Sequence, residues 1–518
     1  MRRRHLQLNL TGGRLEPGDT VFVVYGDDVE GARAQPWVTD APPAFAVEVD
    51  RTGGGTYVSD AVVPVAVEPG PPAHLHVVVP SGARPGASVP IRVRVLDEFG
   101  NLCSSCVDDA RLPDGRTMAI RDGRADAEMR FIREGVHRIE VAVVGCGLRG
   151  RSNPCRVAAD GPVPCWGDPH VHTNISDGVG SPAFALAYGR DVACLDFVAI
   201  TDHDVEFHHG WFTRGQQRLS DADWAALAET IARHRVPGRF ATLRAYEWTG
   251  RPYGDRCIYL RSDHAPLYRY ELGDAPTPDA LWQRLRAAGL ASALVVPHTT
   301  ASGFMGTDWA AHDGDLERLV EIYSMHGASE CADGPTAMAG AVPGRYVRDF
   351  LARGYRVGFT GGGDMHSSQP GNPLLAVGPY RTLRHRAGLT AVFADRVDEV
   401  AIFDAMRRRR TYATTGARIL LEFTVYDASR GAPVALAAGG PVIARGAVYG
   451  TALLAEVTVV RNGQHVYVAH PQQEDFTFEW RDPQPPLPGT YYYLRAVQAD
   501  GHVAWSSPIW IDGSREDT

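Results

Sequence analysis

Two kinds of hydrophobic pattern divide the chain. Up to about residue 160, apolar and polar positions alternate in short runs such as AFAVEVD, HLHVVVP and VPIRVRVLDEFGN, with Gly, Pro and Asp turns between them. Such alternation is typical of strands with one buried face, and helical periodicity is missing from this part. Because the proline-rich VEPGPP interrupts the pattern, we expect a small β domain over residues 1–72 and an immunoglobulin-like β-sandwich over 73–160.

The pattern changes near residue 162, where apolar runs begin to alternate with amphipathic helices. Ser181 and Thr277 each stand directly before a proline, which predicts two capped helix starts, and Gly289 follows the second helix as a stop. Repeated βα units favour parallel strands, and residues 161–417 have about the length of an α/β barrel. Alternation returns in LAEVTVVRNG and DFTFEWRD, so we expect a C-terminal β-sandwich over 418–514.

Length and charge agree with a multidomain globular protein. The chain has 518 residues, 22% of them charged and 44% hydrophobic, with a net charge of -9. That charge disfavours a general nucleic-acid or anionic membrane surface, so we expect a small-molecule substrate and neither a nucleic-acid nor a membrane partner. The start MRRRHLQLNL lacks the apolar stretch of a signal peptide, and no later run is long enough to span a membrane, which predicts a cytoplasmic protein.

Residue usage excludes several chemistries. The sequence contains no lysine, so all 52 basic residues are arginine. A phosphate-loop lysine, a Schiff-base lysine and a carbamylated lysine bridging two metals are therefore excluded. The 8 cysteines are too few for a disulfide scaffold, and only Cys103 and Cys106 have a metal or redox spacing. Their Gly/Asp-rich turn favours an incidental or weak structural role.

Metal-binding residue types recur at the ends of apolar runs in the 161–417 segment. The runs are found in WGDPHVHT, DFVAITDHD, ATLRAYEWTG, ALVVPHTT, VEIYSMHG and RVGFTGGGDMHS. Because the carboxyl ends of parallel strands converge on one face of a barrel, these groups can meet although they are far apart in sequence. The candidate ligands are His170, His172, Asp177, His203, Glu247, His298, His326, Asp364 and His366.

Each motif alone has an ordinary structural explanation. A His-x-His pair also occurs on exposed strands, a single strand-end histidine is often a satisfied structural residue, and Glu247 could pair with nearby arginines. Together, however, three carboxylates in one barrel mouth would repel one another without a cation, and the ligands exceed what one zinc ion takes. Two or three divalent ions are therefore expected. The glycines of GGGD lack the spacing of a phosphate loop and predict close backbone approach beneath the metals.

The motifs H-x-H at 170–172, T-D-H at 201–203 and D-x-H at 364–366 resemble the polymerase and histidinol phosphatase (PHP) superfamily of metal-dependent hydrolases, over roughly residues 162–416. The resemblance implies a distorted, TIM-like barrel of seven βα units with a trinuclear centre of Zn, Mn or Fe. It also implies the ligand sets: His170, His172, Glu247 and Asp364 for the first ion; Glu247, His298 and His326 for the second; Asp177, His203 and His366 for the third.

Two details refine the resemblance. The position of Asp177 is often histidine in the superfamily, so the third site is expected to be weaker or to prefer a harder ion such as manganese. The flanking β domains and the C-terminal YYYLRAVQADGHVAWSSPIWI are similar to a poorly characterised branch related to carbamate (carbaryl-type) hydrolases. The competing amidohydrolase barrel also opens with H-x-H, but most of its binuclear members need a carboxylated lysine that this chain lacks.

The expected activity is that of a phosphoesterase in which a metal-bridging hydroxide attacks phosphorus, and the same centre could instead cleave a carbamate or carboxyl ester. Arg251 and Arg256 could grip an anionic substrate, although solvated surface arginines are the simpler explanation. Asp202 could orient His203 or another ligand. A non-catalytic binding protein with a degenerate barrel remains the alternative of another class, and it is disfavoured because all nine ligand positions carry competent residues.

Overall fold

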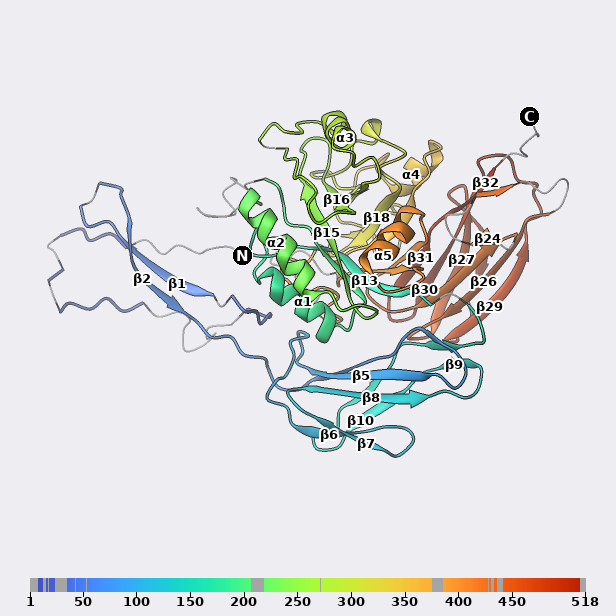
Figure 1. Ribbon diagram of the computed structural model, residues 1–518, viewed down its shortest axis with the longest axis horizontal. Coiled ribbons are helices and arrows are strands. Elements are labelled where there is room, and N and C mark those ends of the chain that lie inside the picture. Colours follow the sequence, from blue (N-terminus) through green and yellow to red (C-terminus); the bar gives the residue numbers. More distant parts are fainter. Residues whose placement is uncertain are drawn as a thin grey trace.

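The computed structural model describes residues 8–512, apart from 13–14, 17, 24–34, 42, 53, 162, 206–218, 271, 375–384, 427, 430–432 and 436–440. The basic N-terminal residues 1–7 lie outside this description. Within it the protein is multidomain and mostly β-sheet, and its five α-helices all lie between strands β13 and β22 (Figure 1). In the same ranges, no helix combines the length and hydrophobicity that a membrane crossing would require.

The N-terminal part is all β, as the alternating pattern predicts. Its strands are β1 (Ala44–Val49), β2 (Val58–Pro64), β3 (His74–Val78), β4 (Gly82–Ala83), β5 (Ser88–Leu96), β6 (Asp108–Arg111), β7 (Thr117–Ile120), β8 (Arg124–Arg130), β9 (Gly135–His137), β10 (Glu140–Val143), β11 (Arg149–Arg151) and β12 (Cys155–Val157). Strands β1 and β2 pair as a separate two-stranded sheet that projects from the rest of the molecule (Figure 1). The other ten form three small sheets around a core that includes Val89, Ile91 and Val93.

The middle part mixes strands and helices. Its elements are β13 (Cys165–Val171), α1 (Pro182–Asp191), β14 (Phe197–Ile200), α2 (Asp221–His234), β15 (Ala241–Trp248), β16 (Arg256–Leu260), α3 (Pro278–Ala287), β17 (Leu294–Pro297), the 3-10 helix η1 (Trp309–Ala311), β18 (Leu319–Ser324), β19 (Gly327–Ala328), α4 (Val347–Ala352), β20 (Gly358–Gly361), β21 (Leu389–Val392), α5 (Glu399–Arg407) and β22 (Thr411–Thr414). The side chains of Ser181 and Thr277 accept hydrogen bonds from the backbone N–H of the third residue of α1 and α3, which confirms both predicted helix starts.

Strand directions in this part depart from a regular repeat of seven βα units. Strands β13, β14 and β15 are parallel, but β16 runs antiparallel to both β15 and β17. Seven βα units are therefore not shown by the described elements, because the short connection from β15 to β16 contains no helix and reverses the chain. The reversal has a second consequence: the start of β16 lies at the same edge as the ends of β15 and β17.

Parallel pairing returns later in the chain. Strands β18 and β20 are parallel, and an isolated parallel bridge between Val171 and Met365 joins the end of β13 to the segment that follows β20. A second bridge pairs His203 with Glu247. The first bridge thus joins segments about two hundred residues apart in sequence, and the second joins the segment after β14 to the end of β15; since β14 pairs with both β13 and β15, all these ends lie at one edge.

The C-terminal part is again all β. Its strands are β23 (Leu420–Val425), β24 (Ala428–Ser429), β25 (Pro433–Ala435), β26 (Ile443–Tyr449), β27 (Leu454–Arg461), β28 (Gln464–Ala469), β29 (Asp475–Arg481), β30 (Tyr491–Gln498), β31 (Val503–Ser506) and β32 (Ile509–Asp512). Strands β24, β23, β26 and β29 form one sheet. Strands β27, β28, β30 and β31 belong to another sheet. Because β31 pairs with β22, this sheet continues into the strands of the middle part.

Candidate metal centre

The described residues place all nine predicted ligands in one connected, mostly buried group where the strands end. His170 is the penultimate residue of β13, Glu247 is the penultimate residue of β15, and His298 follows β17 directly. Three overlapping donor sets could each hold an ion, and their ligand atoms lie within 4.8 Å of one another in each set. The sets are His170, Glu247, Cys257 and His298; His172, Asp177, His203 and His366; and His170, His172 and Asp364.

Glu247 lies at the middle of the group. One of its carboxylate oxygens, Oε2, is 3.1 Å from Nε2 of His170 and 3.3 Å from Nε2 of His172. The other, Oε1, is 3.0 Å from Nε2 of His298. Asp364 approaches the same histidine pair, with Oδ1 at 3.2 Å from Nε2 of His172. The side chain of Glu247 is fully buried, and the histidines that its carboxylate approaches belong to all three donor sets.

His326 lies at the margin of the group. Its Nε2 is 3.0 Å from Oδ2 of Asp364, but 18% of its side chain is exposed to solvent, and it belongs to none of the three donor sets. The expected pairing of His326 with His298 around one ion therefore stays a prediction. Cys257, which was not among the predicted ligands, lies with His170, Glu247 and His298 in one of the three donor sets.

A second four-donor set surrounds Asp177. Its Oδ2 is 3.0 Å from Nε2 of His366, and its Oδ1 is 3.7 Å from Nε2 of His203 and from Nδ1 of His172. The ring of His172 stacks between the other two imidazoles, with centroid distances of 4.4 Å to His203 and 4.2 Å to His366. His203 is held from its other nitrogen by the hydroxyl of Thr249 at 2.7 Å.

Several donor atoms in the group have no hydrogen-bond partner. They are Nδ1 of His172, Oε1 of Glu247 and Nε2 of His298, all buried. The last two lie 3.0 Å apart without hydrogen-bond geometry. A buried polar atom without a partner costs about 1–3 kcal/mol, and most such atoms in native proteins are satisfied. A divalent cation would satisfy these atoms, and an imidazole and carboxylate donor set is one that zinc, manganese and iron accept.

The charges in the group depend on one another. Burial by itself lowers the pKa of His172, but hydrogen bonds to Asp364 and Glu247 outweigh it and raise that pKa to about 10. Burial likewise raises the pKa of Asp364, yet the facing His170 and His326 hold it well below its usual range. The carboxylates therefore stay ionised and need positive charge beside them, which protons on the histidines or bound cations can supply.

Two carboxylates that the sequence analysis missed support the donors. Glu321, in the middle of the apolar run LVEIYS of β18, accepts from Nδ1 of His170 at 3.0 Å. Asp168 is fully buried and accepts backbone N–H bonds from His170, Gly363 and Gly371. A metal-binding histidine usually donates its second ring N–H to such a group, which fixes its tautomer. A charged residue inside an apolar strand was the signal that could have identified Glu321.

Close backbone approach at GGGD, as predicted, is found in the structure. A Cβ added to Gly362 would lie 2.0 Å from Oε2 of Glu321 and 2.7 Å from Cβ of His170. One added to Gly363 would lie 2.4 Å from Oδ2 of Asp168. Only glycine therefore fits between β20 and the buried carboxylates that hold His170.

Asp202 positions a loop. Its carboxylate accepts from the backbone N–H of Thr173 at 2.7 Å, from the Thr173 hydroxyl at 2.6 Å and from the Ser176 hydroxyl at 2.6 Å. These bonds fix the segment between His172 and Asp177. The described hydrogen bonds thus connect Asp202 to the ligand group through this loop, and the orientation of His203 or another ligand by Asp202 stays a prediction.

The two candidate substrate-binding arginines differ. The side chain of Arg256 is fully buried, its Nε donates to Glu317 at 2.7 Å, and its Nη1 donates to the carbonyls of Tyr253 and Gly254, whereas its contact with a substrate stays a prediction. It is thus a structural cation, since burial in an ion pair removes it from solvent. Arg251 is half-buried, and its guanidinium lies 4.6 Å from the centre of the exposed Phe304 ring.

Fold and donor sets together define a multidomain, mainly β protein with a buried candidate metal centre. A family model described as "Protein of unknown function (DUF3604)" matches residues 204–336 and 378–456. An uncharacterised protein of Chlamydia pneumoniae is 26% identical over 545 aligned positions, covering 96% of this chain and 84% of the relative. An uncharacterised protein of Chlamydia muridarum is 25% identical with the same coverage of each chain.

Solved structures give lower similarity. A two-domain protein from Bacteroides vulgatus, described as containing a predicted PHP-like metal-dependent phosphoesterase, is 14% identical with a TM-score of 0.36, covering 67% of this chain and 96% of its own. PsfC from Pseudomonas syringae is 15% identical with a TM-score of 0.30, covering 48% of this chain and 90% of its own.

Proposed function

We propose that this protein is a metal-dependent hydrolase that acts on phosphate esters. The observation that carries the proposal is the buried group of imidazole and carboxylate donors, several of them without hydrogen-bond partners. The order of the H-x-H, T-D-H and D-x-H motifs, which resembles that of the PHP superfamily, supports phosphorus as the electrophile. We also propose the flanked, distorted barrel that this resemblance implies, with boundaries near residues 72, 160 and 417.

Each residue has a role in this proposal. Bound divalent ions would lower the pKa of a water molecule to about 7 and offset the charge of the ester oxygens. Glu247 would hold an ion on either side of its carboxylate, since its two oxygens face different histidines. Glu321 and Asp202 would fix the orientation of His170 and of the loop that carries Asp177. Arg251, which is half-buried, would contact an anionic substrate.

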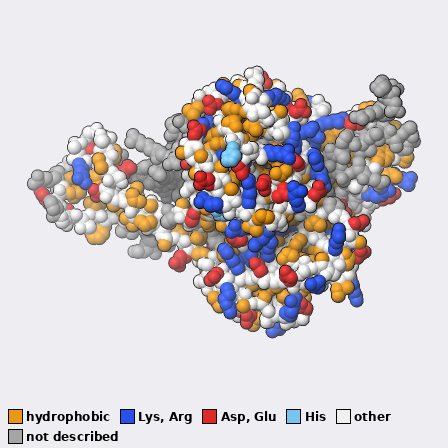
Figure 2. Space-filling view, viewed as in Figure 1, with side chains coloured by type: hydrophobic (Ala, Val, Ile, Leu, Met, Phe, Trp, Pro, Cys, Tyr) orange, Lys and Arg blue, Asp and Glu red, His pale blue; other side chains and the backbone are white. Residues whose placement is uncertain are grey.

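We also propose a small-molecule substrate and a cytoplasmic location. The face drawn in Figure 2 carries arginine and acidic side chains interspersed, which suits a small molecule better than a nucleic acid. All eight cysteines are free thiols, the form that a reducing cytoplasm maintains. Zinc, manganese and iron are the ions to load.

The experiment is a turnover comparison on protein stripped with a chelator and then loaded with zinc, manganese or iron. An aryl phosphate, a bis-aryl phosphodiester and an aryl carbamate are offered in parallel. We expect metal-dependent release of the aryl alcohol from a phosphate ester. The change Glu247→Gln should reduce it at least about 100-fold through lost metal affinity. A matched change, Glu330→Gln, removes a buried carboxyl that binds Tyr493 and Trp505 and lies outside the donor sets, so it should retain the activity of folded protein.

Two results would redirect the proposal. Turnover of the carbamate alone would assign the same centre to carbonyl chemistry. Purified protein with less than about one ion per chain, silent on all three substrates after loading, would favour a non-catalytic binding protein with a degenerate barrel.

A further inference from the structure

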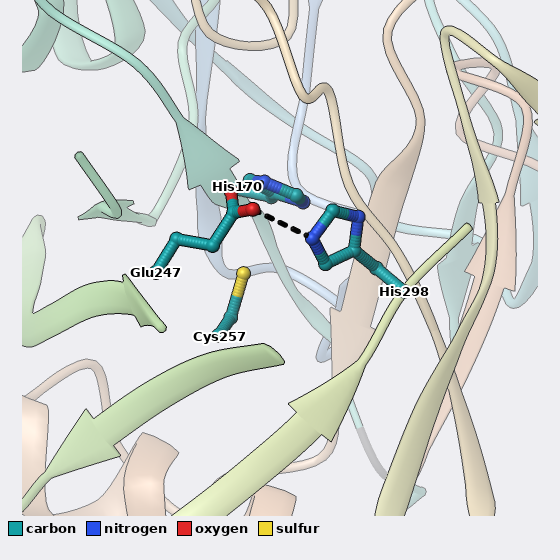
Figure 3. Close-up of side chains that lie close together, drawn as sticks. All are labelled: His170, Glu247, Cys257 and His298. Atoms are coloured by element: carbon teal, nitrogen blue, oxygen red, sulfur yellow. Dashed lines mark hydrogen bonds and ion pairs between the residues drawn. The ribbon is translucent and has the colours of Figure 1, made fainter. Parts of the chain in front are cut away.

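Cys257 occupies an unexpected place in the donor group. It is the second residue of β16, where the antiparallel register sets it directly opposite Glu247. Its side chain is 1% exposed, and its sulfur belongs to the four-donor set with His170, Glu247 and His298. Figure 3 shows the four side chains lying close together, with their donor atoms turned toward one another.

The surroundings distinguish Cys257 from an ordinary core cysteine. Cys165 belongs to the same hydrophobic cluster and is also buried, but it is in none of the donor sets. Beside Cys257, by contrast, Oε1 of Glu247 and Nε2 of His298 are buried without hydrogen-bond partners. His170 has Nδ1 bound to Glu321, which leaves its Nε2 for the group. Two imidazoles, a carboxylate and a sulfur thus face one small volume.

We propose that Cys257 is a thiolate ligand of one metal ion, completing a tetrahedral site with His170, Glu247 and His298. The inference rests on the proposed function in one respect, namely that the donor group binds metal. A tetrahedral zinc ion with usual bond lengths sets nitrogen and sulfur donors about 3.5 Å apart, so donors within 4.8 Å need only small side-chain rotations to close on it. As the sulfur–metal bond forms, the thiol proton leaves to solvent.

A thiolate changes which ion the site selects. Sulfur is a soft donor that favours zinc or iron over manganese and magnesium, which prefer oxygen. The set around Asp177 contains three imidazoles and a carboxylate and no sulfur. The two four-donor sets share no residue, so the chain would hold a soft-metal site beside one that tolerates harder ions.

Cobalt provides the test, because cobalt(II) bound to thiolate has a near-ultraviolet charge-transfer band that imidazole and carboxylate ligands do not produce. The full chain is stripped with a chelator, titrated with cobalt, and its absorption and cobalt content are recorded. We expect the band in the wild-type protein and its loss in Cys257→Ser and Cys257→Ala. Cys165→Ser is the matched control from the same cluster and should keep the band. Zinc affinity should fall at least about 10-fold in Cys257→Ser, with manganese affinity little changed.

The outcomes separate this inference from the proposed function. Cobalt bound without the band, or a band that persists in both folded Cys257 variants, overturns the thiolate ligand and leaves a metal centre of other donors. Failure to bind cobalt at all overturns both. A band that depends on Cys257 in a protein that hydrolyses nothing supports the ligand and overturns the hydrolase.

Discussion

The contact between Glu321 and His170 can be tested by one isosteric change. The carboxylate lies 3.0 Å from Nδ1 of His170, its side chain is 2% exposed, and it accepts a hydrogen bond from that nitrogen. The change Glu321→Gln keeps the shape and one oxygen acceptor but removes the negative charge. That charge makes His170 a stronger donor through its other nitrogen, so its loss should weaken metal binding.

The magnitude follows from the kind of contact. Changes to the carboxylate partner of a metal-binding histidine reduce affinity by about 10–100-fold, or about 1.4–2.7 kcal/mol. The metal-free fold should lose little, because a neutral amide is easier to bury than a carboxylate. Affinity is measured by competition between the protein and a chromophoric chelator for zinc. Stability is measured by urea unfolding with chelator in excess.

Glu317→Gln is the matched control. Glu317 is a buried carboxyl that binds Arg256 at 2.7 Å and His312 at 2.7 Å, and it is outside the donor sets. Its neutralisation should cost about 3 kcal/mol of unfolding free energy, since it leaves a buried guanidinium uncompensated, while zinc affinity is retained. Wild-type zinc affinity in Glu321→Gln would refute the reasoning, as would equal affinity losses in the two variants.

Three further predictions follow. Gly362→Ala should destabilise the protein by about 1–3 kcal/mol in urea unfolding, because the new Cβ would lie 2.0 Å from a carboxylate oxygen. Gly314→Ala is the control and should be neutral, since its Cβ would lie 3.8 Å from the nearest atom. Equal losses of stability in the two variants would contradict the crowding at Gly362. Zinc affinity should rise with pH between 6 and 9, because the pKa of about 10 keeps His172 protonated in this range and zinc binding expels that proton. Calorimetry in buffers of different ionisation enthalpy should detect the released proton. Zinc binding without proton release would refute the protonated state of His172. Asp177→Ala should deplete one ion and His170→Ala another by elemental analysis; loss of the same ion in both would show that the two donor sets are one site.

The candidate ligands could be predicted from sequence because strand ends are recognisable locally. Each histidine or carboxylate follows a short apolar run, and the order of the motifs carries the resemblance. The helix starts at Ser181 and Thr277 could also be predicted from neighbouring residues, because a hydroxyl-bearing residue directly before a proline favours a capped helix N-terminus. The alternating β pattern of both flanking parts needed only a window of a few residues.

The positions of Cys257 and of the two arginines in the structure could not be predicted from the pattern of neighbouring residues. A parallel repeat places only strand ends at the mouth, whereas β16 runs antiparallel and brings its first residues there. Arg256 was expected at a substrate, but its partner Glu317 lies sixty-one residues away in sequence. The continuation of one sheet from β22 into β31 likewise joins segments that no periodicity links.

The sequence by itself determined the elements, the types of donor and the exclusion of lysine chemistry, because these depend on neighbouring residues and on composition. Only the tertiary structure decided which donors lie close enough together to hold an ion, that a thiol lies among them, and that Glu321 and Asp168 hold His170. Those contacts join residues far apart in the chain, and whether they form depends on strand direction and on the close packing at Gly362 and Gly363, where no side chain fits.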